Sequence, residues 1–434
     1  MNALSDVDST ALSETWETVI LTTLKGKEKI SINSKTGNDT KCYNSTENAI
    51  AFPCKTIEWA IEKHEYESFQ FIVEPGTYTL TKELVFVEEN MQIFSRDGLV
   101  GDGAAEATKL ICSVRCLNLD IVKQQQYAPR KIEGLHFISA SSLSSATATT
   151  VLDKGGAIYF ANIEASSELS GAFFDTVIKD CIFEGFSVVA SGGAIYIVNV
   201  RNRVQVLNVV FKNNTASIGG AMSIDTSTNV VVSNVQCTNN YVKDYGGCLS
   251  ITSDTDEGVP SSIAVNNLIS TNDMSLWRGG AVYIGRSSVM TMIDSTVQSA
   301  SGSGAIYASS AKVLLSQVLV LDSKCPIDGA AIMCVSSSLK LNGNSNISGT
   351  KGRGLKGMGC ALQVKNVRFF NNTVVAFKAT DMDINGGGIS LVSESELTVA
   401  SSTFESNTAD GDGGAIMCNE CIKIDITNST FLGN

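Results

Sequence analysis

Residues 192–197 read GGAIYI, and residues 219–224, one period further along the chain, read GGAMSI. The same pattern of a Gly pair, a small residue and alternating apolar residues occurs ten times with small variations. The copies are GGAIYF at Gly155, GGAIYI at Gly192, GGAMSI at Gly219, GGCLSI at Gly246, GGAVYI at Gly279, SGAIYA at Ser303, GAAIMC at Gly329, GCALQV at Gly359, GGGISL at Gly386 and GGAIMC at Gly413. Their usual spacing is about 27 residues. Such a period is typical of solenoids, in which one structural unit stacks on the next.

Each copy has the alternation of a β-strand. The fourth and sixth residues are apolar in all ten copies, whereas the fifth varies among Tyr, Ser, Met and Gln. Because successive side chains of a strand point to opposite faces, the fourth and sixth residues are predicted to face inward and the fifth outward. The outward tyrosines are Tyr159, Tyr196, Tyr283 and Tyr307. They are candidates for stacking on sugar rings, or else they stack on one another and stabilise the sheet.

A second pattern, an apolar residue followed three positions later by Asn, precedes several of the Gly pairs, as in Phe211 with Asn214 and Phe404 with Asn407. Asn tolerates left-handed backbone and Gly bends without steric cost, so both predict corners between strands. One coil of strands and corners cannot bury its own apolar face, but stacked coils bury a continuous column. The fold class that we expect is all-β, a right-handed parallel β-helix with a short N-terminal capping helix.

The chain divides into four segments on this reading. These are an N-terminal extension at 1–34, a cap at 35–69, the first coils at 70–150, and the Gly-repeat β-helix at 151–434, which we expect to be truncated at its C-terminus. The short helix is predicted from Ile57, Ala60 and Ile61, which have helical spacing. Residues 17–24, ETVILTTL, read as a spare strand that either pairs with the first coil or adds to a neighbouring molecule.

Charge and hydropathy exclude some partners. The net charge is −12, and the basic residues form no stripe along the sequence, so nucleic acid is not an expected partner. No apolar run approaches the roughly 20 residues that a spanning helix needs, so no membrane insertion is expected within this chain.

The sequence offers no recognisable catalytic group, and we expect the protein not to be an enzyme. Glycoside hydrolysis needs a pair of carboxylates, and no Asp-Asp pair occurs. The only histidines, His64 and His136, read as a surface residue and a half-buried core residue.

No cofactor is expected, with Ca²⁺ as a minor hypothesis. Acidic residues cluster at Asp254, Asp256 and Glu257, at Asp381 and Asp383, and at Asp410 and Asp412. Carboxylate oxygens suit Ca²⁺, but none of these clusters completes a known calcium loop, so solvated corners explain them better.

Cysteines and sequons provide the remaining candidate sites. Of the 12 cysteines, three local pairs are predicted as disulfides: Cys42 with Cys54, Cys112 with Cys116, and Cys418 with Cys421. Others, such as Cys248, are expected to fill small apolar positions. N-glycosylation sequons occur at Asn38, Asn44, Asn213, Asn346, Asn371 and Asn428. In FKNNT and FFNNT, alternation predicts that Asn213 and Asn371 point outward while the next Asn bonds within the stack.

These repeats resemble the GGA and FxxN repeats of the chlamydial polymorphic outer membrane proteins and related surface proteins. The opening, PCKTIEWAI followed by FIVEPGTYTL, is similar to the start of pectin-lyase-like β-helices. The resemblance implies the pectin-lyase-like fold and surface display.

We therefore expect an extracellular or cell-surface structural or adhesive rod, able to assemble end to end into fibres and to carry N-glycans. Its expected partners are further copies of itself, or host and matrix glycans and surface proteins. The alternative is a carbohydrate-binding or carbohydrate-active β-helix.

Overall fold

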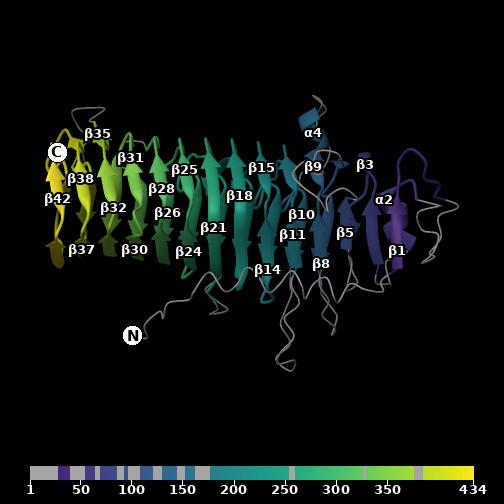
Figure 1. Cartoon of the computed structure of the whole chain (residues 1–434), viewed down its shortest axis with the longest axis horizontal. Coiled ribbons are helices and arrows are strands. Elements are labelled where there is room, and N and C mark those ends of the chain that lie inside the picture. Colours follow the sequence, from purple (N-terminus) through teal and green to yellow (C-terminus); the bar gives the residue numbers. More distant parts are fainter. Residues whose placement is uncertain are drawn as a thin grey trace, which may run out of the picture.

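The computed structural model is a rod of stacked coils (Figure 1). It describes residues 28–39, 54–63, 69–85, 92–95, 108–120, 130–143, 152–161, 176–253, 260–325, 329–375 and 385–434. Every strand pairing among these residues is parallel, and each strand pairs with its counterparts one coil before and one coil after, so the predicted right-handed parallel β-helix is confirmed.

Each coil contributes strands to three rows that run along the rod. The first row holds β1 (Glu28–Ile32), β2 (Phe69–Val73), β5 (Gln92–Ser95), β8 (Arg130–Glu133), β11 (Thr176–Lys179), β14 (Val204–Leu207), β18 (Val230–Thr238), β21 (Ser262–Thr271), β24 (Val289–Ile293), β27 (Lys312–Ser316), β30 (Ser338–Asn342), β33 (Ala361–Lys365), β37 (Glu396–Ala400) and β41 (Lys423–Thr427). The second row holds β3 (Gly76–Leu80), β6 (Thr108–Cys112), β9 (His136–Ser139), β12 (Ile182–Glu184), β15 (Val210–Lys212), the later halves of β18 and β21, β25 (Thr296–Gln298), β28 (Leu319–Leu321), β31 (Asn346–Ser348), β34 (Arg368–Phe370), β38 (Thr403–Glu405) and β42 (Thr430–Leu432). These two rows form one 25-stranded sheet.

The third row is a separate 12-stranded sheet. It holds β4 (Leu84–Val85), β7 (Leu117–Asp120), β10 (Ile158–Ala161), β13 (Ile195–Val198), β17 (Met222–Asp225), β20 (Leu249–Thr252), β23 (Val282–Gly285), β26 (Gly304–Ser309), β29 (Ala330–Val335), β32 (Arg353–Met358), β36 (Ile389–Val392) and β40 (Ile416–Cys418). Short strands extend some corners: β16 (Thr215–Ile218), β19 (Tyr241–Tyr245), β22 (Met274–Ser275), β35 (Thr373–Val374) and β39 (Thr408–Ala409).

The core is a set of columns of inward side chains. In the second row, Phe137, Phe183 and Phe211 stack with ring centroids 4.9 and 5.3 Å apart. Ile158 and Ile195, at the fourth motif position of the third row, are fully buried. The inward direction predicted from the alternation is therefore confirmed.

The two motif glycines have different roles. The first, such as Gly192 with φ 67°, adopts the left-handed conformation that disfavours any residue with a Cβ atom. The second, such as Gly193, lies where a Cβ atom would overlap the carbonyl oxygen of Gly220 in the next coil. Thus one glycine makes the bend and the other lets adjacent coils approach.

The FxxN corners differ in one detail from their prediction. The left-handed residue is the one before the motif Asn: Asn213 has φ 56°, whereas Asn214 is fully buried and does not have positive φ. Asn, Asp, Ser and Gly hold such positions along the rod, as expected for residues that tolerate this conformation.

One of the ten motif copies lies in a different row from the others. GCALQV at Gly359 leads into β33, which pairs with β30 in the first row, while the third-row place in that coil belongs to β32. Alternation is common to all three rows, so a copy that lacks the second Gly does not specify its row. Leu362 and Val364 are nevertheless buried, as predicted.

The N-terminal cap contains the predicted helix, α2 (Ile57–Lys63), whose Ile57, Ala60 and Ile61 are buried. A second helix is the single turn α4 (Ala140–Leu143). Within the predicted N-terminal extension, β1 pairs with β2 as the first rung of the stack. The spare strand at 17–24 lies outside the described residues. Within the described part of the chain, no helix is long and apolar enough to span a membrane.

Candidate functional site

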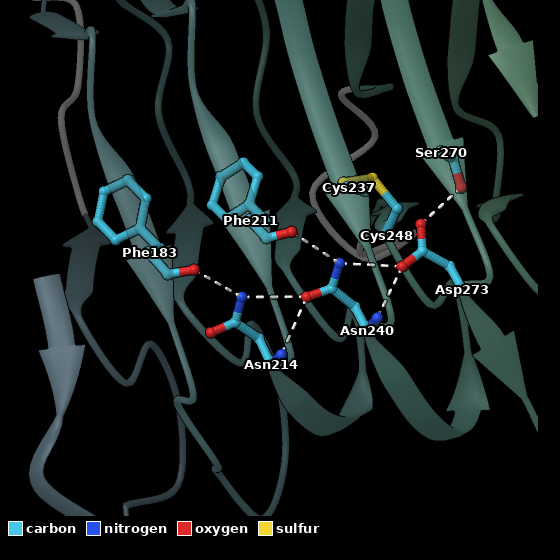
Figure 2. The surroundings of a disulfide bond; sticks show 8 residues. All are labelled: Phe183, Phe211, Asn214, Cys237, Asn240, Cys248, Ser270 and Asp273. Carbon is cyan, nitrogen blue, oxygen red and sulfur yellow. Dashed lines mark hydrogen bonds between the residues drawn. A yellow bond between two sulfur atoms is a disulfide. The ribbon is translucent and has the colours of Figure 1, made fainter. Parts of the chain in front are cut away.

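A buried polar ladder runs from coil to coil in the middle of the rod (Figure 2). The backbone N–H and the side-chain amide of Asn214 both donate to Oδ1 of Asn240, each over 3.0 Å. Asn240 repeats the pattern on Oδ1 of Asp273, over 2.7 and 2.9 Å. Each Asn amide also donates backward, from Asn214 to the Phe183 carbonyl and from Asn240 to the Phe211 carbonyl. The ladder satisfies these buried polar groups and ties three coils together.

Asp273 ends this ladder. Its second oxygen accepts from the Ser270 hydroxyl over 2.6 Å, and the side chain is fully buried. Burial raises the pKa of Asp273 to about 6, although the hydrogen bonds from Ser270 and Asn240 act in the opposite direction. Sequence reasoning missed this residue, whose one signal was an Asp in place of the motif Asn.

A disulfide between Cys237 and Cys248 lies beside Asp273 (Figure 2). Cys237 takes the place of Phe211 in the stacked column, and Cys248 takes the place of the motif Ala. The expectation that Cys248 only fills space is therefore wrong. Cys237 and Cys248 occupy different positions of the repeat and meet across one coil. An alignment of the repeats along the chain does not reveal such a contact. Within the described residues, these sulfurs and Asp273 are the one His, Cys, Asp and Glu group compact enough for a metal ion, but the sulfurs are bonded to each other.

The predicted local disulfides Cys112–Cys116 and Cys418–Cys421 are present. Cys54 is also disulfide-bonded, and its predicted partner Cys42 lies outside the described residues. Sequence reasoning missed a further bond, Cys334–Cys360, which joins adjacent coils. Among the residues that the structure describes, Cys181 and Cys325 are free cysteines; both are buried, and burial raises the pKa of each thiol to about 12.

A second Asn ladder runs through the C-terminal coils. Asn372 donates to Oδ1 of Asn407 over 2.9 Å from its side chain, and Asn407 donates to Oδ1 of Asn434 over 2.8 Å. The neighbouring rings of Phe369 and Phe404 stack at 5.0 Å. Between the two ladders, the equivalent positions hold Ala300, Ser323 and Thr350.

The outward tyrosines are not exposed, so their prediction as a sugar platform is wrong. Tyr196, Tyr283 and Tyr307 are 3, 7 and 5% exposed, and Tyr159 is half-buried against Tyr196. Tyr283 stacks on Tyr307 at 5.8 Å, and on Tyr245 at 4.6 Å. The motif turn causes part of this burial, since a Cβ atom at Gly279 would lie 3.0 Å from Cβ of Tyr283.

The sequons differ in exposure. Asn213 and Asn371 are exposed at left-handed corners, whereas Asn214 and Asn372 beside them are fully buried, as alternation predicts. Asn38 and Asn428 are also exposed. Asn346 is partly buried in β31, and Asn44 lies outside the described residues.

His136 is a buried residue of the outer face rather than a half-buried core residue. Its Nε2 lies 3.0 Å from a carboxylate oxygen of Glu184 in the next coil. Glu133, on the same face, pairs with Lys131 and Lys179. His64 lies outside the described residues.

Of the three acidic clusters weighed for Ca²⁺, only the last is described. Asp410 and Asp412 are exposed, and the backbone N–H of Asp412 bonds to the side chain of Asn385. The clusters at 254–257 and 381–383 lie outside the described residues.

Comparison with known proteins identifies the repeat. The Chlamydia polymorphic membrane protein repeat matches residues 401–419, which include β38. No curated protein matches the chain.

Similar solved structures include PfbA, a surface adhesin of Streptococcus pneumoniae (12% identity, 93% of this chain and 90% of that chain, TM-score 0.42). Another is the A-module of the mannuronan C-5 epimerase AlgE6 of Azotobacter vinelandii (9% identity, 86 and 94%, TM-score 0.42). One is an adhesin and the other an enzyme, so this likeness assigns no activity. The chain is a parallel β-helix that carries a Chlamydia polymorphic membrane protein repeat.

Proposed function

We propose that this protein is a secreted or surface-displayed rod with a structural or adhesive role. The observation that carries the proposal is the continuous buried core, which fills the rod and is fastened by disulfides at Cys112–Cys116, Cys237–Cys248, Cys334–Cys360 and Cys418–Cys421. Disulfides persist mainly in oxidising, extracytoplasmic surroundings. A stiff scaffold of this kind suits display, with binding by its outer faces or assembly with further copies.

Immunogold electron microscopy of the native source tests the location and the form of the rod. We expect label on the outer surface or in the surrounding matrix, as single rods for an adhesive role or as fibres for end-to-end assembly. Alkylation without prior reduction should leave Cys237 and Cys248 unmodified. Label confined to the cell interior, with both thiols modified, would contradict the proposal.

The proposal includes N-glycans at the corners if the source is a eukaryote that secretes the chain. A glycan on Asn213 or Asn371 projects from a left-handed corner away from the core, whereas Asn346 is partly buried in a strand. After secretion from eukaryotic cells, we expect Asn213→Gln and Asn371→Gln each to remove one glycan from the intact mass, while Asn346→Gln removes none from the folded product. Folded protein that carries a glycan at Asn346 but none at the two corners would contradict this prediction.

One feature favours the second candidate, a carbohydrate-active or carbohydrate-binding protein. His136 and Glu184 of adjacent coils lie 3.0 Å apart, as an acid–base pair would. Release of products from anionic or neutral polysaccharides by the wild-type protein, and its loss in Glu184→Gln, would establish this candidate. Under the leading proposal, no product is released.

A further inference from the structure

We propose that Asp273 is a buried proton-binding site that holds the middle coils of the rod more firmly in mildly acidic surroundings than at neutral pH. The proposal rests on the direction of the Asn ladder, on the groups that face the carboxyl, and on the position of Ser270.

The ladder has a fixed direction, because each member donates to the next. Asn214 donates to Asn240, and Asn240 donates to Asp273. Its last member must therefore accept hydrogen bonds from Asn240. It has no further ladder residue to which it could donate, since Ala300 occupies the equivalent position in the following coil. An Asn there could donate backward, as Asn214 and Asn240 do, but its second amide N–H would have no ladder residue ahead of it. A carboxyl group meets the requirement, at the cost of placing an ionisable group in the core.

The groups that face Asp273 provide no compensating charge. The preceding coil contributes Asn240 and the sulfurs of Cys237 and Cys248, and its own coil contributes Ser270. The sulfurs do not titrate while they are bonded to each other. No ion pair in the described part of the chain includes Asp273. Ionisation is therefore supported by three neutral donors alone.

Ser270 allows the site to accept a proton without losing a bond. When Asp273 is ionised, the Ser270 hydroxyl donates to its second oxygen over 2.6 Å. When Asp273 is neutral, that oxygen carries the proton and donates to the same hydroxyl, which reverses its role. Oδ1 continues to accept from Asn240 in both states. Protonation thus removes the buried charge and preserves the ladder.

The direction of the pH dependence follows from linkage. The pKa of Asp273 is raised from 3.8 to about 6, so the folded coil binds this proton more tightly than the opened coil. The contribution to stability therefore grows as the pH falls through 6, and it is complete below 3.8. Between about pH 7.5 and about pH 5, the gain is about tenfold in the equilibrium between the closed and the opened coil.

Hydrogen exchange followed by mass spectrometry tests this inference on the intact disulfide-bonded protein. Exchange rates at about pH 7.5 and about pH 5 are divided by the chemical rate at each pH. We expect protection of peptides from 235–245 and 268–276 to rise about tenfold in acid relative to peptides from 312–321. In Asp273→Asn, a neutral variant of the same shape, this relative rise should disappear. An equal response in the variant, or unchanged protection in the wild type, would overturn the inference.

A second measurement avoids dependence on the variant. The infrared difference between about pH 5 and about pH 7.5 should contain the carbonyl stretch of a neutral carboxylic acid shielded from solvent exchange. If Asp273→Asn does not fold, this band in the wild type, with the relative rise in protection at 235–245, supports the proton site. Absence of the band would show that the carboxyl stays ionised and would overturn the inference.

Discussion

Gly193→Ala is expected to lower the free energy of unfolding by about 3 kcal/mol or more. A Cβ atom at this position would overlap the carbonyl oxygen of Gly220 and approach that of Thr215. Both obstacles are backbone atoms, so no side-chain rotation relieves them, and the two coils must separate locally. Urea-induced unfolding, followed by circular dichroism on the disulfide-bonded protein, measures the change.

Gly359→Ala is the matched control for this prediction. Gly359 has φ 62°, but the nearest atom to an added Cβ atom lies 3.6 Å away, so only the backbone conformation opposes the change. Its expected cost is about 1–2 kcal/mol. If Gly193→Ala were no more destabilising than Gly359→Ala, close approach between coils would not be the reason for the second motif glycine.

Asn240→Ala is expected to destabilise the protein by about 3–5 kcal/mol, because it opens the middle of the ladder. The change removes the acceptor of both Asn214 donors, as well as the amide that bonds to Phe211 and Asp273. The groups left behind are buried and lose these hydrogen bonds. The same urea titration measures the loss.

The neighbouring residue provides the comparison. Asn239→Ala alters an exposed Asn with φ 56° and leaves the ladder intact, so its cost should be limited to about 1–2 kcal/mol of backbone strain. Equal losses for the two variants would mean that the corner conformation, and not the buried hydrogen bonds, explains the motif asparagine.

Much of the fold was predictable from the sequence because its signals are local and repeated. The Gly pairs, the alternation at residues such as Ile158 and Ile195, and the helical spacing at Ile57 depend on conformations that a few neighbouring residues define. The outward direction of Asn213 and the pairing of Cys112 with Cys116 are also local. Each of these predictions agrees with the structure.

The candidate site could be identified only from the tertiary structure. Cys237 meets Cys248, and Asp273 closes a ladder that starts at Asn214, only because stacking places residues from successive coils at the same position. The burial of Tyr283 has a similar origin, since the ring lies between side chains of neighbouring coils and under the motif turn. The row to which the Gly359 copy belongs is likewise known only from the strands that pair with β33, which are β30 and β37.

By itself, the sequence determined that this chain is a stack of parallel β-coils with inward apolar columns. Only the tertiary structure decided which outward residues are covered, which cysteines pair across a coil, and where a buried carboxyl replaces an amide. The physical reason is that periodicity reports the direction of a side chain relative to its own strand. Burial, hydrogen bonding and pKa instead depend on atoms contributed by other coils. Inserted residues between the repeats obscure the register of those coils in the sequence.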